Sequence, residues 1–463
     1  MQMLNRLSVS VFIFVFAFCG SVLSIADADE PVRITIDAED PQWIVSELLT
    51  GSHFVYAFER DSLYEDQRIV DWMRGCRVGL IRWPGGTAVQ HYHWDDLNGI
   101  AFTHDSWDPA YSEPPVDPSE YMDVDEYVAF CRKVGAEPMI GFNIKSGRRF
   151  ANEEDSLEEA RRLVEYCRDR EYDVKNWYVG NECYIGFSVD AYIERVDRYG
   201  AMVRSIDPDA VIIGDWKFGP EFKNRFEQSI RIACESEEID VLEVHEKWGN
   251  EWGLASGRTI EDWRNEFPLY DGRFGESIRR FHEETAAAGR SDIRLGMNEW
   301  GLGSVQGGDR FDHALVAADY LIEMFRNRVD QACYWNLNMG SRDSRILETT
   351  NDGHELVRLN PIADVFTMFA PAMGETLLPL TSSERHVYGF AVVSEKNDRL
   401  QIYLINKSEA ASNVRIDLQN TGLDSSSLLI ESFVAPGEIV RQETMQGDML
   451  SLPPYSMNRV VVE

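Results

Sequence analysis

Basic residues are scarce in this chain. Its 463 residues include 45 Lys and Arg against 79 Asp and Glu, so the formal net charge is −34. A surface with this excess of negative charge repels the phosphate backbone of DNA and RNA. The composition therefore argues against a nucleic-acid partner and predicts an acidic, well-solvated surface.

The sequence signatures of several other chemistries are also missing. The chain has no Walker loop, no GxSxG nucleophile elbow and no dinucleotide-binding fingerprint, which argues against the enzyme classes that depend on them. Seven cysteines are present but none forms a CxxC pair, so a structural zinc site is not expected. Buried free thiols are the simpler interpretation, and a disulfide stays open because the pattern favours no particular pairing.

Long hydrophobic runs are absent apart from one near the N-terminus. Residues 9–18 read VSVFIFVFAF, and small residues at 26–28 (ADA) mark a candidate cleavage site. This pattern predicts a signal peptide over residues 1–28, because the run is too short to span a membrane comfortably. We therefore expect a secreted or periplasmic protein with no membrane span. Lipoprotein anchoring through Cys19 is the weaker alternative, since bulky Phe18 precedes it where such signals carry a small residue.

Short apolar runs alternate with helical patterns between residues 51 and 372. Several runs are apolar throughout, as strands buried on both faces are. Between them, apolar residues recur at helical spacing, and one helix is predicted to begin at Ser156 with a capping box to Glu159. Eight strand–helix units in series predict an α/β fold, a (β/α)8 TIM barrel. The eight runs cover residues 53–58, 79–85, 137–144, 174–181, 210–216, 239–246, 293–300 and 331–338.

The pattern changes over residues 373–463. Short runs of alternating apolar and polar residues, such as RLQIYLINKS and NRVVVE, are separated by turn residues. This is typical of an antiparallel β-sandwich. The segment 29–50 contains VRITIDA and is predicted to join the same sandwich. We therefore expect a catalytic barrel over residues 51–372 followed by a C-terminal β-sandwich domain.

Two of the predicted barrel strands end in an Asn-Glu pair. The fourth leads to Asn181-Glu182 and the seventh contains Asn298-Glu299. The carboxyl ends of barrel strands meet at one end of the barrel, where catalytic residues sit. Two facing carboxylates suit glycosidic cleavage, because one protonates the leaving oxygen while the other attacks the anomeric carbon or activates water. Neither step needs a cofactor or metal, so none is expected. A single glutamate at a strand end would more often be a surface or salt-bridged side chain, but the pair predicts catalysis.

These motifs resemble those of the retaining glycoside hydrolases with (β/α)8 barrels, the clan A enzymes. VGNE is similar to the clan's acid/base motif on strand four, and NEWG is similar to its nucleophile motif on strand seven. Within the clan, the chain is most similar to family 51, the α-L-arabinofuranosidases. That similarity rests on the stretches LIRWPGG, DEYVAFCRKVGAEPMIGFN, HALVAADYLIEMFRNR and LPPYSMNRVVV.

The resemblance implies a role for each residue that matches the motifs. Glu182 would be the acid/base and Glu299 the nucleophile. Asn181 would bind the sugar 2-hydroxyl, a contact that strengthens in the transition state. Trp335, at the end of the eighth strand, would stack under the sugar. Without the resemblance, a tryptophan in a strand is more often part of the core.

Four further residues are predicted to bind substrate. His245, at the end of the sixth strand, would line the site, although a structural histidine fits that position as well. Arg82, on the second strand, would contact either the nucleophile or an inner carboxylate. The other two are Asn298, beside the nucleophile, and Trp248, in the long connection after the sixth strand.

Two long connections, residues 86–120 and 247–273, are rich in aromatic side chains. Long loops in compact domains are often functional, and aromatic faces stack on sugar rings. The alternative is that each loop packs a small core of its own. The aromatic residues are Tyr92, Trp94, Phe102, Trp107, Tyr111, Trp248, Trp252, Trp263 and Tyr270.

The first of these connections also contains an HxH motif, His91-Tyr92-His93. Such a motif binds zinc in metal-dependent hydrolases, which usually carry it on the first barrel strand with further His and Asp ligands. Here it follows the second strand and lacks obvious companions. A metal-dependent hydrolase is therefore a competing hypothesis that the sequence does not favour.

Three positions depart from the family 51 pattern. The stretch HFVYAFER lacks the Glu-His pair expected after the first strand, Thr87 stands where the family has Asn, and Lys247 stands where it has Tyr. We therefore expect a secreted retaining glycoside hydrolase that cleaves a plant or algal oligo- or polysaccharide and acts weakly on aryl α-L-arabinofuranosides. The alternatives are an α-L-arabinofuranosidase proper and a non-catalytic carbohydrate-binding barrel. The sequence leaves the oligomeric state open.

Overall fold

The computed structural model describes most of the chain from residue 30 onwards. The predicted signal peptide lies outside the described residues. Within the described part, no helix combines the length and the apolar character needed to cross a membrane. The described ranges are 30–56, 59–90, 92–95, 118–145, 153–218, 224–248, 258–303, 305–335, 337–338, 344–420, 427–445 and 449–462.

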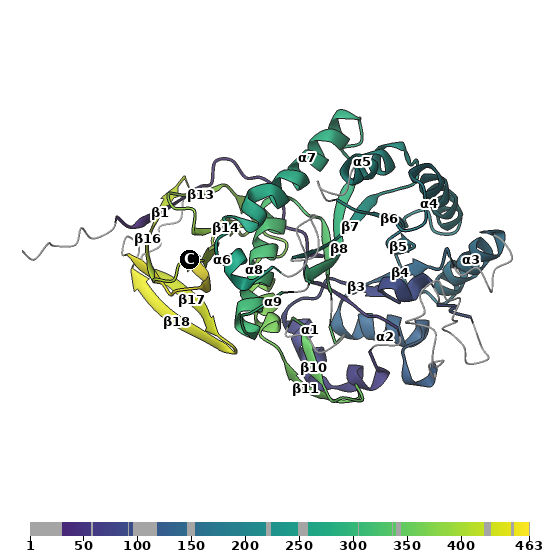
Figure 1. Ribbon diagram of the computed structural model, residues 1–463, viewed down its shortest axis with the longest axis horizontal. Coiled ribbons are helices and arrows are strands. Elements are labelled where there is room, and N and C mark those ends of the chain that lie inside the picture. The colour runs from purple at the N-terminus through teal and green to yellow at the C-terminus, as the bar shows by residue number, and fades with distance from the viewer. Residues whose placement is uncertain are drawn as a thin grey trace, which may run out of the picture.

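Eight parallel strands close into a barrel, which confirms the predicted fold class (Figure 1). The first strand pairs with the last as well as with the second, so the sheet has no free edge. Nearly all of the strand residues are buried, since side chains fill the interior and helices cover the outside. The strands are β2 (Gly51–His53), β3 (Leu80–Trp83), β4 (Glu137–Phe142), β5 (Asn176–Val179), β6 (Val211–Trp216), β7 (Val241–Trp248), β8 (Arg294–Leu302) and β9 (Gln331–Trp335).

Helices follow the barrel strands and pack around them. Their ends obey local capping chemistry: α2 begins with a reciprocal capping box between Asp123 and Glu126 and ends at Gly135, whose φ is 83°. The helices are α1 (Gln67–Gly75), α2 (Val124–Val134), α3 (Glu153–Asp169), α4 (Val189–Arg204), α5 (Arg225–Glu235), α6 (Ile260–Arg264), α7 (Arg273–Ala287), α8 (Arg310–Arg326) and α9 (Ile362–Phe369).

The capping box predicted at Ser156 is wrong. Ser156 lies inside α3, where its hydroxyl donates to the carbonyl of Asn143 at 2.7 Å and lies 2.6 Å from the Tyr199 hydroxyl. Glu159 accepts from a ring nitrogen of His93 at 2.9 Å instead of capping the helix. Both side chains are taken by tertiary partners that a local pattern does not reveal.

A β-sandwich lies beside the barrel, coloured yellow-green and yellow in Figure 1. Strand β1, from the N-terminal segment, runs parallel to β16 and antiparallel to β13, so this segment joins a sheet of the C-terminal domain. Apolar side chains of both sheets form a separate core, which includes Ile34, Ile402 and Val460. The larger sheet has the order β12 (Thr376–Leu378), β14 (Val387–Val393), β15 (Leu400–Asn406), β20 (Ser456–Val462), β17 (Ser427–Ala435), β18 (Glu438–Met445). The smaller sheet has the order β13 (Leu380–Ser382), β1 (Val32–Asp37), β16 (Ser412–Gln419), β19 (Leu450–Leu452). A separate hairpin pairs β10 (Leu347–Thr349) with β11 (Leu356–Leu359).

A buried ion pair joins the sandwich to the barrel. Lys407 Nζ lies 3.1 Å from the Asp319 carboxylate on α8, and both side chains are fully buried. The Tyr388 hydroxyl and the Trp263 indole N–H also donate to Asp319, at 2.6 and 2.9 Å. With these donors around it, Asp319 is fully satisfied, and the two domains are held in one arrangement.

Candidate active site

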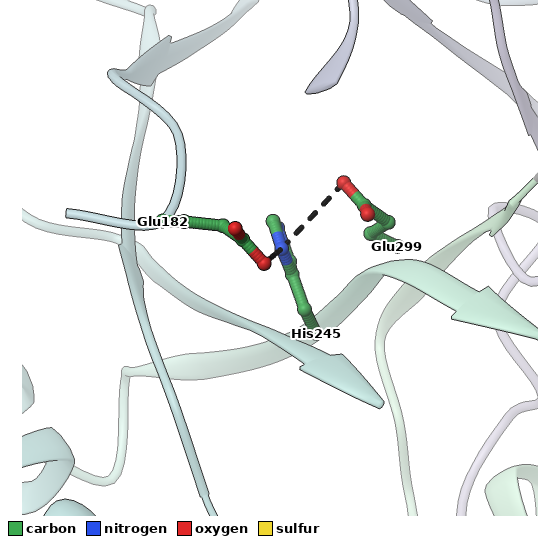
Figure 2. A group of neighbouring side chains, drawn as sticks. All are labelled: Glu182, His245 and Glu299. Atoms are coloured by element: carbon green, nitrogen blue, oxygen red, sulfur yellow. Dashed lines mark hydrogen bonds and ion pairs between the residues drawn. The ribbon is translucent and has the colours of Figure 1, made fainter. Parts of the chain in front are cut away.

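The two predicted catalytic glutamates lie together at the carboxyl-terminal end of the barrel (Figure 2). Glu182 follows β5, the fourth barrel strand, and Glu299 lies near the end of β8, the seventh. His245 reaches between them from β7. One carboxylate oxygen of each glutamate and one ring nitrogen of His245 lie within 4.8 Å of one another. The barrel thus brings these three side chains together although Glu182 and Glu299 are 117 residues apart in the sequence (299 − 182).

The backbone at Glu182 has an unusual conformation. Its φ is +49°, in the left-handed region that non-glycine residues rarely adopt, and the preceding Gly180 also has a positive φ of 80°. The amide of Cys183 donates to the Asp215 carboxylate at 3.1 Å, which holds this turn from β6. Such strain persists only where the surroundings enforce it and is concentrated at functional sites. The turn directs the Glu182 side chain towards His245, as Figure 2 shows.

Strand β7 presents a column of polar side chains to the barrel interior: Glu243, His245 and Lys247. They alternate along the strand, so all three share one face. His245 Nδ1 lies 3.4 Å from Glu182 and 3.5 Å from Glu299. Lys247 Nζ contacts Glu299 Oε1 directly. Each of the two predicted catalytic glutamates therefore has a cationic side chain from β7 beside it.

Arg82 lies in the barrel interior. It contacts both an inner carboxylate, Glu243, and the predicted nucleophile, Glu299, the two alternatives predicted from the sequence. Its guanidinium lies 3.0 Å from Glu243 and 3.7 Å from Glu299, and it is fully buried. It also donates to the side-chain oxygen of Asn181 at 3.0 Å. The face of Tyr178 packs against the guanidinium at 4.1 Å. Arg82 thus fixes an inner carboxylate, the candidate nucleophile and Asn181 at the same time.

Asn298 does not face the site in the way the sequence analysis predicted. Its side chain donates to Glu243 at 2.7 Å and is fully buried, while its carbonyl lies 2.8 Å from a ring nitrogen of His53. The pairing of β8 with both neighbouring strands shifts register around this position. A substrate-binding role for Asn298 is therefore wrong for this conformation. Its contacts hold Glu243 and the backbone beneath Glu299.

Trp335 lies at the edge of the site and keeps part of its surface exposed. Its ring lies 4.9 Å from Lys247 Nζ and meets the His53 ring edge-on at 5.0 Å. Gly86 lies against the indole, because a Cβ built at Gly86 would come 3.0 Å from it. The structure therefore brings Trp335 to the glutamate pair, where an aromatic face can border a sugar.

Trp248 is not at the site, so its predicted contact with substrate is wrong. The side chain is fully buried and its indole N–H donates to Glu266 at 3.3 Å. Trp248 is three residues from His245 on the same strand, an odd spacing that turns it towards the surrounding helices. Trp263 and Tyr270, from the same connection, are also fully buried. The described part of this loop packs its aromatic side chains into the main hydrophobic core of the barrel, so these side chains are not available to stack on a sugar.

In the other long connection, residues 86–120, the aromatic residue Tyr92 is also buried. Tyr92 is buried against Trp83 and Tyr56, at ring separations of 4.8 and 4.6 Å. His93 is occupied by Glu159, so this half of the HxH motif is engaged as a structural histidine. Residues His91, Phe102, Trp107, Tyr111 and Trp252 lie outside the described residues.

The charges of the site set the protonation of both glutamates. Burial alone raises the pKa of Glu299, but the positive charges of Lys247 and His245 outweigh it and lower that pKa to about 2. Burial also raises the pKa of Glu182, but His245, Lys247 and the Tyr184 hydroxyl lower it below its usual value. Burial lowers the pKa of His245, whereas the charges of Glu299 and Asp215 and a hydrogen bond to Glu182 raise it to about 10. The free protein thus holds an imidazolium between two carboxylates.

Asp215 and Glu243 are buried carboxyl residues beside His245 that the sequence analysis did not include in the candidate site. Burial raises the pKa of Asp215 to about 8, whereas the pKa values of Glu182 and Glu299 are lowered. Burial also raises the pKa of Glu243, but Arg82 and His245 more than offset it. A carboxylate within an otherwise apolar strand, two residues before a histidine, is the signal that could have revealed Glu243. Asp215 was visible in the same way in VIIGDW.

Two groups of side chains in the described residues have the spacing of metal ligands. One is Glu182, His245 and Glu299, and the other is Asp215, Glu243 and His245. Arg82 and Lys247 already place positive charge against these carboxylates, so a metal ion would be repelled by its neighbours. The arrangement therefore fits proton transfer and carboxylate attack better than metal binding.

The chain has the fold of a (β/α)8 barrel joined to a β-sandwich, like the solved family 51 glycoside hydrolases on which it superimposes, and this likeness supports the predicted resemblance. More particularly, it resembles glycoside hydrolase family 51. Residues 72–246 match the family model described as Alpha-L-arabinofuranosidase 1 domain. The solved α-L-arabinofuranosidase of Thermotoga maritima, in its arabinose complex, superimposes with a TM-score of 0.72. That comparison covers 93% of this chain and 100% of the other at 19% identity.

Curated proteins that are similar in sequence also carry α-L-arabinofuranosidase names. The intracellular exo-α-(1→5)-L-arabinofuranosidase 1 of Bacillus subtilis is 22% identical over 414 residues, 75% of this chain and 76% of that protein. A probable α-L-arabinofuranosidase C of Aspergillus terreus is 24% identical over 170 residues, 31% of each chain. The match to that fungal relative thus spans about a third of its length. At these identities, the comparisons establish the fold, and the activity is a matter for proposal.

Proposed function

We propose that this chain is a retaining glycoside hydrolase in which Glu182 is the acid/base and Glu299 the nucleophile. The observation that carries the proposal is the approach of the two carboxylates, whose nearest oxygens lie within 4.8 Å. Retaining enzymes hold their carboxyl groups about 5–5.5 Å apart, whereas inverting enzymes need about 6.5–9.5 Å to admit a water molecule. The observed spacing supports the retaining geometry.

In the first step, a Glu299 oxygen would form a bond to the anomeric carbon while the glycosidic bond breaks. Glu182 would give its proton to the departing oxygen, leaving a glycosyl ester on Glu299. In the second step, Glu182 would take a proton from water, whose oxygen attacks the anomeric carbon and releases the Glu299 carboxylate. Lys247 binds Oε1 of Glu299, and Oε2 accepts no hydrogen bond from the described residues.

The other residues around the pair would orient it. Arg82 holds the Asn181 side chain, so Asn181 is placed to contact the sugar beside Glu182. The Tyr184 hydroxyl donates to Glu182 at 2.7 Å and favours its ionised form, which suits the second step, when Glu182 acts as a base. Substrate binding must raise the pKa of Glu182 before the first step, because an ionised carboxylate cannot donate a proton.

We propose an oligo- or polysaccharide of plant or algal origin as the substrate. The second candidate is an α-L-arabinofuranosidase proper, which the family model and the Thermotoga maritima structure support. The absent Glu-His pair, Thr87 and Lys247 favour the first candidate, because each changes a position at which the resemblance implies contact with the sugar or the nucleophile. A non-catalytic carbohydrate-binding barrel is disfavoured by the close, charged glutamate pair.

A screen on chromogenic glycosides and on plant and algal polysaccharides tests this proposal. The product anomer is then followed by proton NMR, with Glu299→Ala and Glu182→Gln assayed beside the wild type. Retention of configuration, with turnover lost in Glu299→Ala, is expected. Inversion, or full activity in Glu299→Ala, would contradict the mechanism. Efficient turnover of an aryl α-L-arabinofuranoside with no gain on longer chains would favour the second candidate.

We also propose that the chain is exported, on the strength of the pattern over residues 1–28. The Bacillus subtilis relative carries the word intracellular in its name, so the two proteins would differ in location. Cell fractionation and the N-terminal mass of the full chain expressed in its host test this. A soluble cytoplasmic product that retains residue 1 would contradict it.

A further inference from the structure

Lys247 occupies a position between the candidate nucleophile and the aromatic edge of the site. Its ammonium group contacts Glu299 Oε1 and lies 4.9 Å from the Trp335 ring. Only 16% of its side-chain surface is exposed, so water screens it poorly. A sugar with its anomeric carbon at Glu299 and one face on Trp335 would lie within reach of this cation.

The resting site is electrically balanced. Among the described side chains, the carboxylates of Glu182, Glu299 and Glu243 are in contact with three cations. These cations are Arg82, His245 and Lys247, and each lies within 4 Å of at least one of the carboxylates. Asp215, 3.9 Å from His245, adds no charge near neutral pH, because burial raises its pKa to about 8. The three positive charges are therefore matched by three negative ones before substrate binds.

Catalysis removes one negative charge from this balance. In the substrate complex Glu182 must carry a proton, and in the glycosyl-enzyme Glu299 is a neutral ester. In both states three cations face two carboxylates. Uncompensated charge in a buried site is costly, and the group nearest to the lost Glu299 charge is Lys247. A substrate that brings its own negative charge would restore the balance.

We propose that the sugar bound beside Glu299 carries an anionic group, the carboxylate of a uronic acid or a sulfate ester, and that Lys247 binds it. The proposal rests on the glycosidase function given above and assigns the substrate class of that same site. It also accounts for how Glu182 becomes an acid. A bound anion neutralises Lys247, one of the charges that keep Glu182 ionised in the free protein, and its own charge favours protonation of Glu182.

The surroundings of Glu182 add positive potential. Lys217 Nζ and the Arg225 guanidinium each lie 5.1 Å from the ring of Tyr184, whose hydroxyl donates to Glu182. These cations stand at the same end of the barrel, in a chain whose overall charge is −34. Lys217 and Arg225 therefore favour the local approach of a small anionic ligand, while the rest of the acidic surface repels it.

The test compares acidic sugars with their neutral counterparts. Binding of oligogalacturonate, oligoguluronate and a galactose-6-sulfate oligosaccharide is measured by calorimetry, each against the neutral oligosaccharide of the same length. The proteins are wild type, Lys247→Met, Lys247→Arg and the exposed control Lys396→Met on the sandwich. The binding measurement needs no turnover, so it is independent of whether Glu182 and Glu299 have the proposed roles.

The wild type is expected to bind at least one acidic member about tenfold or more tightly than its neutral match, the effect of one charge-assisted contact. This preference should disappear in Lys247→Met, persist in Lys247→Arg and be unchanged in Lys396→Met. The uronate and sulfate arms identify which anion is bound. The proposal is overturned if no matched pair shows the preference, or if the preference survives in Lys247→Met. Hydrolysis of the neutral sugars alone, lost in Glu299→Ala, would overturn the proposal while leaving the glycosidase function intact.

Discussion

The Asp215 carboxylate accepts a hydrogen bond from the backbone amide of Cys183 at 3.1 Å. This bond ties strand β6 to the turn that carries Glu182, the residue immediately before Cys183. The turn has a positive φ at a non-glycine residue, so it needs such a restraint to persist. Asp215 is therefore placed to position the acid/base without touching the substrate itself.

Removing that restraint should lower activity more than stability. Asp215→Ala is expected to reduce kcat by about 10- to 100-fold, because it leaves the buried amide of Cys183 without an acceptor, which costs about 1–3 kcal/mol. Asp215→Asn keeps an oxygen that can accept from Cys183 and should lose much less. Both variants are assayed on the best substrate from the screen, with the melting temperature measured alongside. Equal losses in kcat would show that the carboxylate charge, and not the bond to Cys183, is what the site requires.

The proposed division of labour predicts an effect of the leaving group. Glu182→Ala should retain near-normal formation of the glycosyl-enzyme on activated aryl glycosides, because a good leaving group needs little proton donation. The same variant should lose about 100-fold or more on natural glycosidic bonds. Pre-steady-state release of the phenol measures the first step directly. A first step slowed equally on both kinds of substrate would argue that Glu182 is not the acid.

A buried carboxyl outside the active site predicts a pH-dependent stability. Burial raises the pKa of Glu59 to about 8, and its carboxylate accepts from the Val55 amide at 2.7 Å. Between the ordinary pKa of 4.5 and a folded value near 8, the folded protein binds more protons than the unfolded chain. Stability is therefore lost as the pH rises through this window. Above about pH 8, Glu59 is ionised in the folded protein as well, so the free energy of unfolding falls no further through this group.

Glu59→Gln removes the cost of ionising a buried carboxyl, and its side-chain oxygen can still accept a hydrogen bond from the Val55 amide. We expect the variant to be more stable than the wild type at pH 8, by about 2–4 kcal/mol, and to show no such gain at pH 4. Urea unfolding at the two pH values measures the difference. The exposed substitution Glu395→Gln serves as the control for loss of one negative charge. A gain that is independent of pH would contradict the assignment.

Chelation should leave activity unchanged. The carboxylates that have metal-ligand spacing are already contacted by Arg82, His245 and Lys247. Proton transfer and carboxylate attack need no metal ion. Activity after dialysis against EDTA should match the untreated enzyme. Loss of turnover that zinc or calcium restores would instead support the metal-dependent hydrolase that the HxH motif suggested.

Much of the fold followed from the sequence because its signals are periodic. Eight apolar runs separated by helical patterns predicted the closed barrel, and its two Asn-Glu pairs predicted which strand ends meet. Predictions from local sequence patterns failed where contacts with distant residues determine the side-chain position. Ser156 resembled a helix cap but bonds Asn143 and Tyr199 inside α3. Capping preferences carry too little free energy to prevail over such contacts.

The candidate site was predictable in part for similar reasons. Glu182, Glu299, His245 and Trp335 stand at strand ends, where the barrel geometry gathers side chains. Trp248 was misplaced because its odd spacing from His245 was not used, although strand alternation alone turns it away from the interior. Asp215 and Glu243 were missed because a carboxylate inside an otherwise apolar strand was not used as a signal. Contacts between strands, such as Arg82 with Glu243, cannot be read from either strand alone.

The central claim is that Glu299 becomes covalently attached to the sugar. Glu182→Ala lacks the base for the second step, so on an activated aryl glycoside it should accumulate the glycosyl-enzyme. Mass spectrometry of the intact protein should then show a gain equal to one glycosyl group. Peptide mapping should place that group on Glu299, and the adduct should be absent from the Glu182→Ala/Glu299→Ala double variant. An adduct on another residue, or turnover with inverted configuration and no adduct, would contradict the account.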